Sequence, residues 1–147
     1  MKIIKYKDTI DVTAYSDYLK SVEGKMPENA YRFASNKFHY DFYSSYCTHD
    51  LKFGRLCISY DKDEKLCYEF QLSKNKFKHE KGLIIYYYDV REITVKDKSD
   101  DKGEIFVDEL IIDELFYDEK KKLIIHELQF IYKEVIILCK DVDAQWI

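Results

Sequence analysis

Apolar residues near the start of the chain recur at the spacing of a helix. In the segment from Val12 to Gly24 they occur at i, i+3, i+4 and i+7, which places them on one helical face, and the glycine ends the helix. These residues are Tyr15, Tyr18, Leu19 and Val22. Pro27 is typical of a helix start, and a second short helix is expected there with Ala30, Phe33 and Ala34 on one face.

The pattern changes to alternation, which predicts strands, from about Phe38. Phe38, Tyr40 and Phe42 alternate with more polar residues, and SSYCTHD then interrupts them. The alternation resumes from Leu51, but the apolar phase differs before and after Gly54. A β-bulge at Gly54 would reconcile the two phases, because a bulge adds one residue to one strand. The whole region is expected to be a meander of antiparallel hairpins.

Part of this pattern occurs twice. YDKDEKLCYEFQL resembles YDEKKKLIIHELQF, and KGLIIYYYDV resembles KEVIILCKDV in the same order. Each copy thus ends in an apolar strand followed by Asp-Val. The second hairpin loop is shorter, and loops are where such differences are tolerated. We therefore expect a duplicated hairpin unit, although hairpins with charged turns and Ile-rich strands can look alike without any duplication.

The predicted fold is α+β, with two short N-terminal helices packed on a predominantly antiparallel sheet or sandwich built from the duplicated hairpin unit. A chain of 147 residues fits a single domain, residues 1–147. Its parts are a helical segment, residues 1–37, a first hairpin unit, residues 38–96, and a second, residues 104–147. The polar segment between the units is expected to be an exposed loop.

Composition and charge narrow the class of partner. The net charge is −4, and residues 104–147 alone carry 5 basic and 11 acidic side chains. A nucleic-acid partner is not expected, because phosphate binding needs clustered lysine and arginine. The N-terminus lacks the apolar run of a signal peptide, and no apolar stretch is long enough to cross a membrane. We expect a cytoplasmic protein that does not bind membranes.

Four side chains within twelve residues are of types that bind metals: His39, Asp41, His49 and Asp50. The His49-Asp50 pair resembles the one that names a class of metal phosphohydrolases, which suggests a metal-assisted hydrolase as one alternative. Those enzymes carry their metal ligands on a helical bundle and need additional His and Asp residues elsewhere in the chain. This pair instead precedes a predicted strand. The competing interpretation is that these polar side chains fix the turn before the strand. No other catalytic or cofactor motif is present, so we predict no cofactor and no enzyme.

Acidic pairs recur every five residues in EIFVDELIIDELFYDE, which has seven acids and no base. A period of five fits neither one face of a helix nor one face of a strand. The segment is either a solvated edge whose charges oppose aggregation or an acidic surface that attracts a basic partner. For the second case the candidate partner-binding residues are Asp108, Glu109, Asp113, Glu114, Asp118 and Glu119.

Tyrosines provide a second candidate surface. Tyr43 and Tyr46 are close to other aromatic residues, and tyrosine is favoured at interfaces because it buries a large area at little cost in rotamer entropy. We include both as candidate partner-binding residues. Rings of this kind could equally belong to the core, or could bind a carbohydrate or another small ligand. The apolar strand Ile84–Tyr88 could also pair across a homodimer if it were an uncovered edge.

A His-Asp pair before a strand, a charged hairpin and an apolar strand ending in Asp-Val together resemble small uncharacterised bacterial domains, some of them similar to immunity proteins of toxin systems. The resemblance spans Thr48 to Trp146 and carries no site residues with it. It implies a non-enzymatic protein-binding domain, such as an immunity or inhibitor protein that covers a basic partner with its acidic surface.

Overall fold

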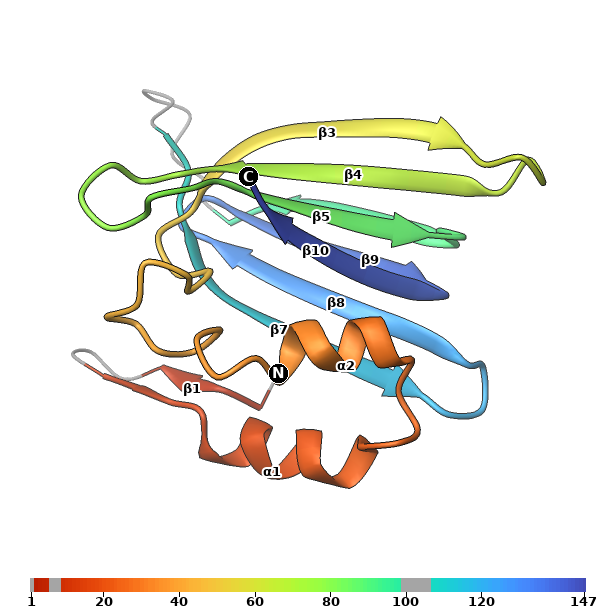
Figure 1. Ribbon diagram of the computed structural model, residues 1–147, viewed down its shortest axis with the longest axis horizontal. Coiled ribbons are helices and arrows are strands. Elements are labelled where there is room, and N and C mark those ends of the chain that lie inside the picture. The colour runs from red at the N-terminus through yellow and green to blue at the C-terminus, as the bar shows by residue number, and fades with distance from the viewer. Residues whose placement is uncertain (1, 6–8, 99–106) are drawn as a thin grey trace.

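The computed structural model describes residues 2–5, 9–98 and 107–147. It is an α+β fold with antiparallel sheets, as the sequence predicts (Figure 1). Most of the expected loop between the hairpin units lies within residues 99–106, outside the described residues. Glu104 of the acidic segment also lies there. The chain begins with a small two-stranded sheet, β1 (Ile4–Lys5) and β2 (Ile10–Asp11).

Two short helices follow, each with an apolar face turned toward the sheets. Helix α1 (Thr13–Val22) buries Tyr15, Leu19 and Val22, and Gly24 follows it with a φ of +78°, a conformation that glycine adopts without strain. Helix α2 (Glu28–Ala34) begins directly after Pro27 and buries Ala30 and Ala34. In the described part of the chain no helix is long and apolar enough to span a membrane.

Residues 35–51 form a series of turns, so the prediction of a strand from Phe38 is wrong. The backbone N–H groups of Phe38, Tyr43 and Tyr46 each bond to a side-chain oxygen two residues earlier. Asn36, Asp41 and Ser44 supply these oxygens. Short polar side chains stabilise turns in this way and compete with strand pairing, which explains why the apolar alternation alone was misleading.

Eight strands form two four-stranded antiparallel sheets that exchange their last strands. The first sheet has the order β10 (Asp141–Trp146), β5 (Leu83–Tyr88), β4 (Leu66–Ser73), β3 (Lys52–Tyr60). The second has the order β6 (Glu92–Asp97), β9 (Lys133–Cys139), β8 (Leu123–Phe130), β7 (Leu110–Asp118). Thus β3–β5 form a meander and β6 joins the other sheet, while β7–β9 form a meander and β10 crosses back.

A β-bulge interrupts the first strand of each meander. The register between β3 and β4 shifts between Phe53 and Arg55, where the sequence predicts a bulge at Gly54. A side chain there would collide with the backbone carbonyl of Gln71, so glycine is required for this close approach. The register between β7 and β8 shifts in the same way, between Leu110 and Ile112.

The core lies between the two sheets. Phe70 of β4 stacks on Phe130 of β8, with ring centroids 6.1 Å apart, and Phe53 contacts both rings. Strand β5 is central, because it pairs with β4 on one side and β10 on the other. The strand Ile84–Tyr88 is therefore not an edge, and the condition for a homodimer through this strand is not met.

Tyrosine hydroxyls cover the edge of β7, the outer strand of the second sheet. Tyr15 of α1 accepts a hydrogen bond from the N–H of Leu115 at 2.7 Å and donates one to its carbonyl at 2.8 Å. The Tyr18 hydroxyl accepts from the N–H of Tyr117 at 2.8 Å. These bonds replace a neighbouring strand, so β7 does not present an open edge here to other chains.

Replacing Tyr15 with Phe should lower the free energy of unfolding by about 1–3 kcal/mol, because Leu115 would keep two buried backbone groups without a partner. Urea denaturation measures this loss. Tyr43→Phe is the matched control, since the Tyr43 side chain is fully in solvent with 99% exposure and should change stability by less than about 0.5 kcal/mol. Equal stability of Tyr15→Phe and wild type would contradict the assigned role.

Candidate functional site

A cluster of buried polar side chains lies where the turns of residues 35–51 meet the two sheets. Asp113 of β7 is fully buried at its centre. His39 contributes Nε2 at 2.9 Å from Oδ1 and 3.0 Å from Oδ2, and His126 of β8 contributes Nε2 at 2.9 Å from Oδ2. The Thr48 hydroxyl donates to Oδ1 at 2.6 Å. Three side chains from two separate segments, the turns and β8, therefore converge on one carboxylate.

The partners of each ring nitrogen fix its protons. His39 Nδ1 lies 2.9 Å from the carbonyl of Phe33, which can only accept, and Nε2 faces the carboxylate of Asp113. Both nitrogens of His39 must donate, so its imidazole is positively charged. His126 Nε2 lies 2.9 Å from Asp113 Oδ2, and its Nδ1 lies 2.7 Å from the Tyr87 hydroxyl. His39 and Asp113 therefore form a buried ion pair, and His126 adds a further hydrogen bond to the carboxylate.

The pKa shifts agree with this assignment. Burial alone would lower the pKa of His39, but the charge of Asp113 and the hydrogen bonds to Asp113 and Phe33 outweigh burial and raise it. Burial alone would raise the pKa of Asp113, but the charge of His39 and the hydrogen bonds from both histidines hold it well below its usual range. Both shifts favour an ionised Asp113 and a protonated His39.

The chemistry of this cluster is structural. Both nitrogens of His39 and of His126 are hydrogen-bonded, so neither ring has a free position to take or give a proton to a substrate. Burial also raises the pKa of Tyr40 and Tyr87 well above the usual value, which keeps both hydroxyls protonated. The cluster fastens the turns to the sheets and forms one wall of a cavity.

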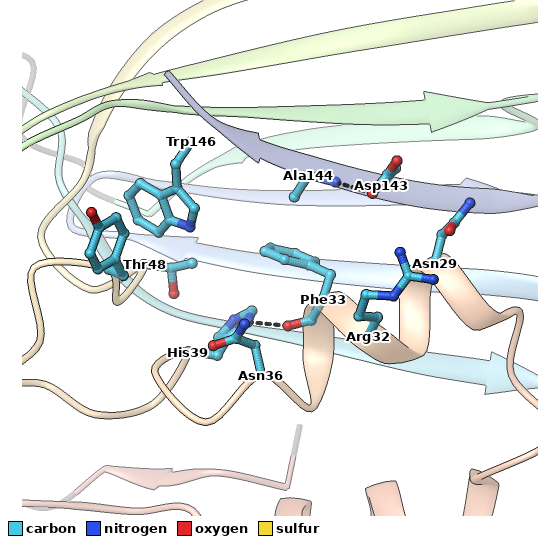
Figure 2. A pocket seen from close by; sticks show the side chains of 10 residues that line it. Asn29, Arg32, Phe33, Asn36, His39, Thr48, Asp143, Ala144 and Trp146 are labelled. Carbon is cyan, nitrogen blue, oxygen red and sulfur yellow. Dashed lines mark hydrogen bonds between the residues drawn. The ribbon is translucent and has the colours of Figure 1, made fainter.

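The cavity lies between α2, the following turns and β10, and has a volume of about 170 Å³ (Figure 2). Part of the lining is aromatic and comes from Phe33, Tyr46 and Trp146. Most of the other lining side chains are polar. Trp146 is fixed by Tyr46, whose ring meets it edge-on at 5.6 Å, and by His79, which stacks on it at 6.3 Å. The remaining lining residues are Asn29, Arg32, Asn36, His39, Thr48, Asp143 and Ala144.

The four side chains considered as metal ligands do not form one site. His39 pairs with Asp113, and the Asp41 carboxylate accepts from the N–H of Tyr43. His49 Nδ1 lies 2.9 Å from its neighbour Asp50. Among the residues that the structure describes, no group of three or more His, Cys, Asp or Glu side chains could hold a metal ion.

The acidic segment does not form one continuous surface. Asp108, Asp113 and Glu114 are buried, Glu109 and Asp118 are half-buried, and only Glu119 is exposed. The reason is that both faces of β7 are covered: Asp113 faces the other sheet, while Glu114 accepts hydrogen bonds from the N–H groups of Lys2 and Ile3 at 2.8 and 3.0 Å. The acids Asp113 and Glu114 therefore have structural partners and cannot contact another protein.

The two candidate tyrosines differ in position. Tyr43 is fully exposed, and Tyr46 lies on the rim of the cavity. The sequence interpretation missed Asp113 and His126 as partners, although each is a polar residue in an apolar strand. It also missed Trp146, because nothing in the sequence places the last strand beside α2.

Replacing Asp113 with Asn should lower the free energy of unfolding by about 3–5 kcal/mol, because His39 would keep a buried charge without its counter-ion. Chemical denaturation measures the loss, with Asp97→Asn as the control. The exposed ion pair of Asp97 with Lys133 should contribute at most about 1 kcal/mol. A loss no larger than that of the control would rule out an ion pair at Asp113.

Stability should also fall as pH rises above 7. The pKa of His39 is raised in the folded protein, so its contribution is complete below the unfolded value of about 6.5 and is lost as pH rises through the folded value. The loss is about 1.4 kcal/mol per unit of pKa difference. Denaturation between pH 7 and 8.5, with an NMR titration of the His39 ring, measures it. Burial lowers the pKa of His79, which affects stability mainly below about pH 6.5.

The sequence has no match among models of known protein families. No curated protein matches it significantly either. The functional interpretation therefore depends on the geometry of the chain itself.

Proposed function

We infer that β3–β6 and β7–β10 are two copies of one hairpin unit and that the protein is a non-enzymatic protein-binding domain. The support for two copies is the register. In β3 and β4, Ile58 pairs with Tyr68, while in β7 and β8, Leu115 pairs with His126, each pair lying at the same distance beyond the bulge. Each fourth strand then pairs with the third strand of the other unit.

The two units differ in what covers them. Ile58 and Tyr60 of β3 correspond in register to Leu115 and Tyr117 of β7. Leu115 is completely buried, whereas Ile58 is 60% and Tyr60 71% exposed. This exposure is the observation that carries the proposal, because both side chains lie on the inward side of their sheet, the same side as the buried ring of Tyr68.

Strand β6, the outer strand of the second sheet, also has an exposed apolar side chain. Val95 pairs with Val135 and is 53% exposed, although Val135 is completely buried. The equivalent strand in the other unit, β10, lies against helix α2 (Figure 1). We call the exposed side chains Ile58, Tyr60 and Val95 the open face. In the second unit, α1 contacts Leu115 and Tyr117 through the Tyr15 and Tyr18 hydroxyls, and α2 lies against β10, whereas the corresponding side chains of the first unit are exposed.

The occupant that this geometry fits is an amphipathic helix of a partner protein. In the second unit α2 uses two small residues, Ala30 and Ala34, to approach the sheets closely, and Phe33 fills the space beside His126 with ring centroids 6.2 Å apart. Binding of a helix with an apolar face to an apolar groove is a recurrent mode of recognition. Exposed apolar side chains that cluster on one surface typically mark such interaction sites.

An immunity or inhibitor role is one form of this function and remains a prediction from the resemblance. Its basic partner would have fewer acids to contact than the sequence suggests. Among the described residues of the acidic segment, Glu109, Asp118 and Glu119 are the acids that retain solvent exposure. The open face, which is apolar, is therefore the better candidate for the main contact, with these acids contributing to the association rate.

The test is capture of a partner from host lysate by wild-type protein, followed by calorimetry with the purified partner. Ile58→Lys should weaken binding at least tenfold, because it places a charge on an apolar contact. Phe77→Lys is the matched control, since Phe77 is another exposed apolar residue, at 74%, in the loop between β4 and β5. Circular dichroism checks that both variants fold. Binding that Ile58→Lys leaves intact, or no specific partner, would contradict the proposal.

A further inference from the structure

The cavity between α2 and β10 has its own chemistry, separate from the open face. Figure 2 shows Trp146 at one end and Asn29, Arg32 and Asp143 at the other. Asn29 donates to Asp141 at 3.4 Å, which aligns the start of α2 with the start of β10. Arg32, one turn along the helix, then lies level with Asp143, two residues along the strand. A cation and an anion thus line the same end of the cavity.

Neither charge is neutralised by the other. Within the described part of the chain no ion pair joins Arg32 to Asp143, and the Arg32 guanidinium contacts Glu28 only in an exposed pair at 3.3 Å. Such exposed pairs contribute little free energy, so Arg32 can exchange this partner for another at small cost. One oxygen of the Asp143 carboxylate accepts from the N–H of Ala144 at 2.9 Å. Its second oxygen can accept from a ligand.

The rest of the cavity lining offers no charge to a ligand. The charge of His39 is balanced by Asp113, and both ring nitrogens of His39 are already hydrogen-bonded. Phe33, Tyr46 and Trp146 line the far end, and the Trp146 indole N–H has no hydrogen-bond partner among the described residues. A volume of about 170 Å³ is below the range of pockets for drug-sized ligands, so only a small molecule fits.

We propose that this cavity binds a free α-amino acid with an apolar side chain. The carboxylate of the ligand pairs with Arg32, which can hold it through two parallel N–H groups, and its ammonium pairs with Asp143. The side chain of the ligand lies against Phe33 and Trp146. A nucleotide or another multiply charged anion is excluded by Asp143. A simple amine could pair only with Asp143 and a simple carboxylate only with Arg32, so each would make one of the two ion pairs that an amino acid makes.

Titration of the full-length protein with L-phenylalanine tests this proposal, because Trp146 is the only tryptophan and reports directly from the cavity. We expect a saturable change in its emission. Three comparison compounds separate the contributions: 2-phenylethylamine lacks the carboxylate, 3-phenylpropionate lacks the ammonium, and glucose tests a sugar site. Each should bind at least tenfold more weakly than L-phenylalanine.

Variants identify the residues responsible. Arg32→Gln and Asp143→Asn should each weaken binding of L-phenylalanine at least tenfold, and Arg32→Gln should also abolish its advantage over 2-phenylethylamine. Arg55→Gln is the matched control, because Arg55 is an exposed arginine of β3 away from the cavity. Circular dichroism checks the fold of each variant, and backbone NMR shifts in α2 and β10 detect binding that does not alter fluorescence.

Three results would overturn the proposal. The first is the absence of saturable fluorescence or NMR changes with L-phenylalanine and L-leucine. The second is equal or tighter binding of glucose or of either singly charged compound. The third is an affinity for L-phenylalanine that Arg32→Gln and Asp143→Asn leave unchanged. None of these results bears on partner binding at the open face, so the two proposals are tested independently.

Discussion

The ionised carboxylate of Asp113 is buried between the sheets, and its cost in free energy must be offset by hydrogen bonds from its surroundings. His39 and Thr48 come from the turns after α2, and His126 comes from the neighbouring strand. Tyr87 of the opposite sheet adds a bond to His126. The positions of the turns, of α2 and of the cavity wall therefore all depend on the hydrogen bonds that this one carboxylate accepts.

This dependence also distinguishes β7 from β3. Strand β7 carries Asp113 at the register position where β3 carries Leu56, each lying two positions beyond the bulged residue, Ile111 or Gly54. Leucine offers no hydrogen bond to a histidine or threonine of the turns. Asp113 therefore holds the turns after α2 against β7, whereas Leu56 at the matching position of β3 could not do so.

Periodicity predicted much of the fold, because burial of one face imposes a repeat on the residues themselves. The stripe of Tyr15, Leu19 and Val22 falls on α1, and the phase change at Gly54 falls on a bulge. The turns around Phe38 were misjudged because side-chain oxygens such as that of Asn36 replace strand partners, and this depends on local geometry.

The site was less predictable than the fold. Asp113 could be recognised as unusual within an apolar run, but its partners His39 and His126 lie 74 and 13 residues away and become neighbours only through the tertiary fold. The regular spacing of the acids suggested a shared surface, yet the two faces of β7 have separate coverings. Whether both faces of a strand are buried depends on which other segments pack against it. The sequence of the strand alone does not identify those segments.

The exchange of β6 and β10 between the sheets has a consequence for synthesis of the chain. The first sheet gains its outer strand only when Trp146 is available, although its other three strands end at Tyr88. During translation β5 therefore has an unpaired side until residues 141–146 have emerged from the ribosome. Pairing between such distant segments slows folding, because loop closure must precede it. Until then β3–β5 form an incomplete sheet in which β5 is a temporary edge.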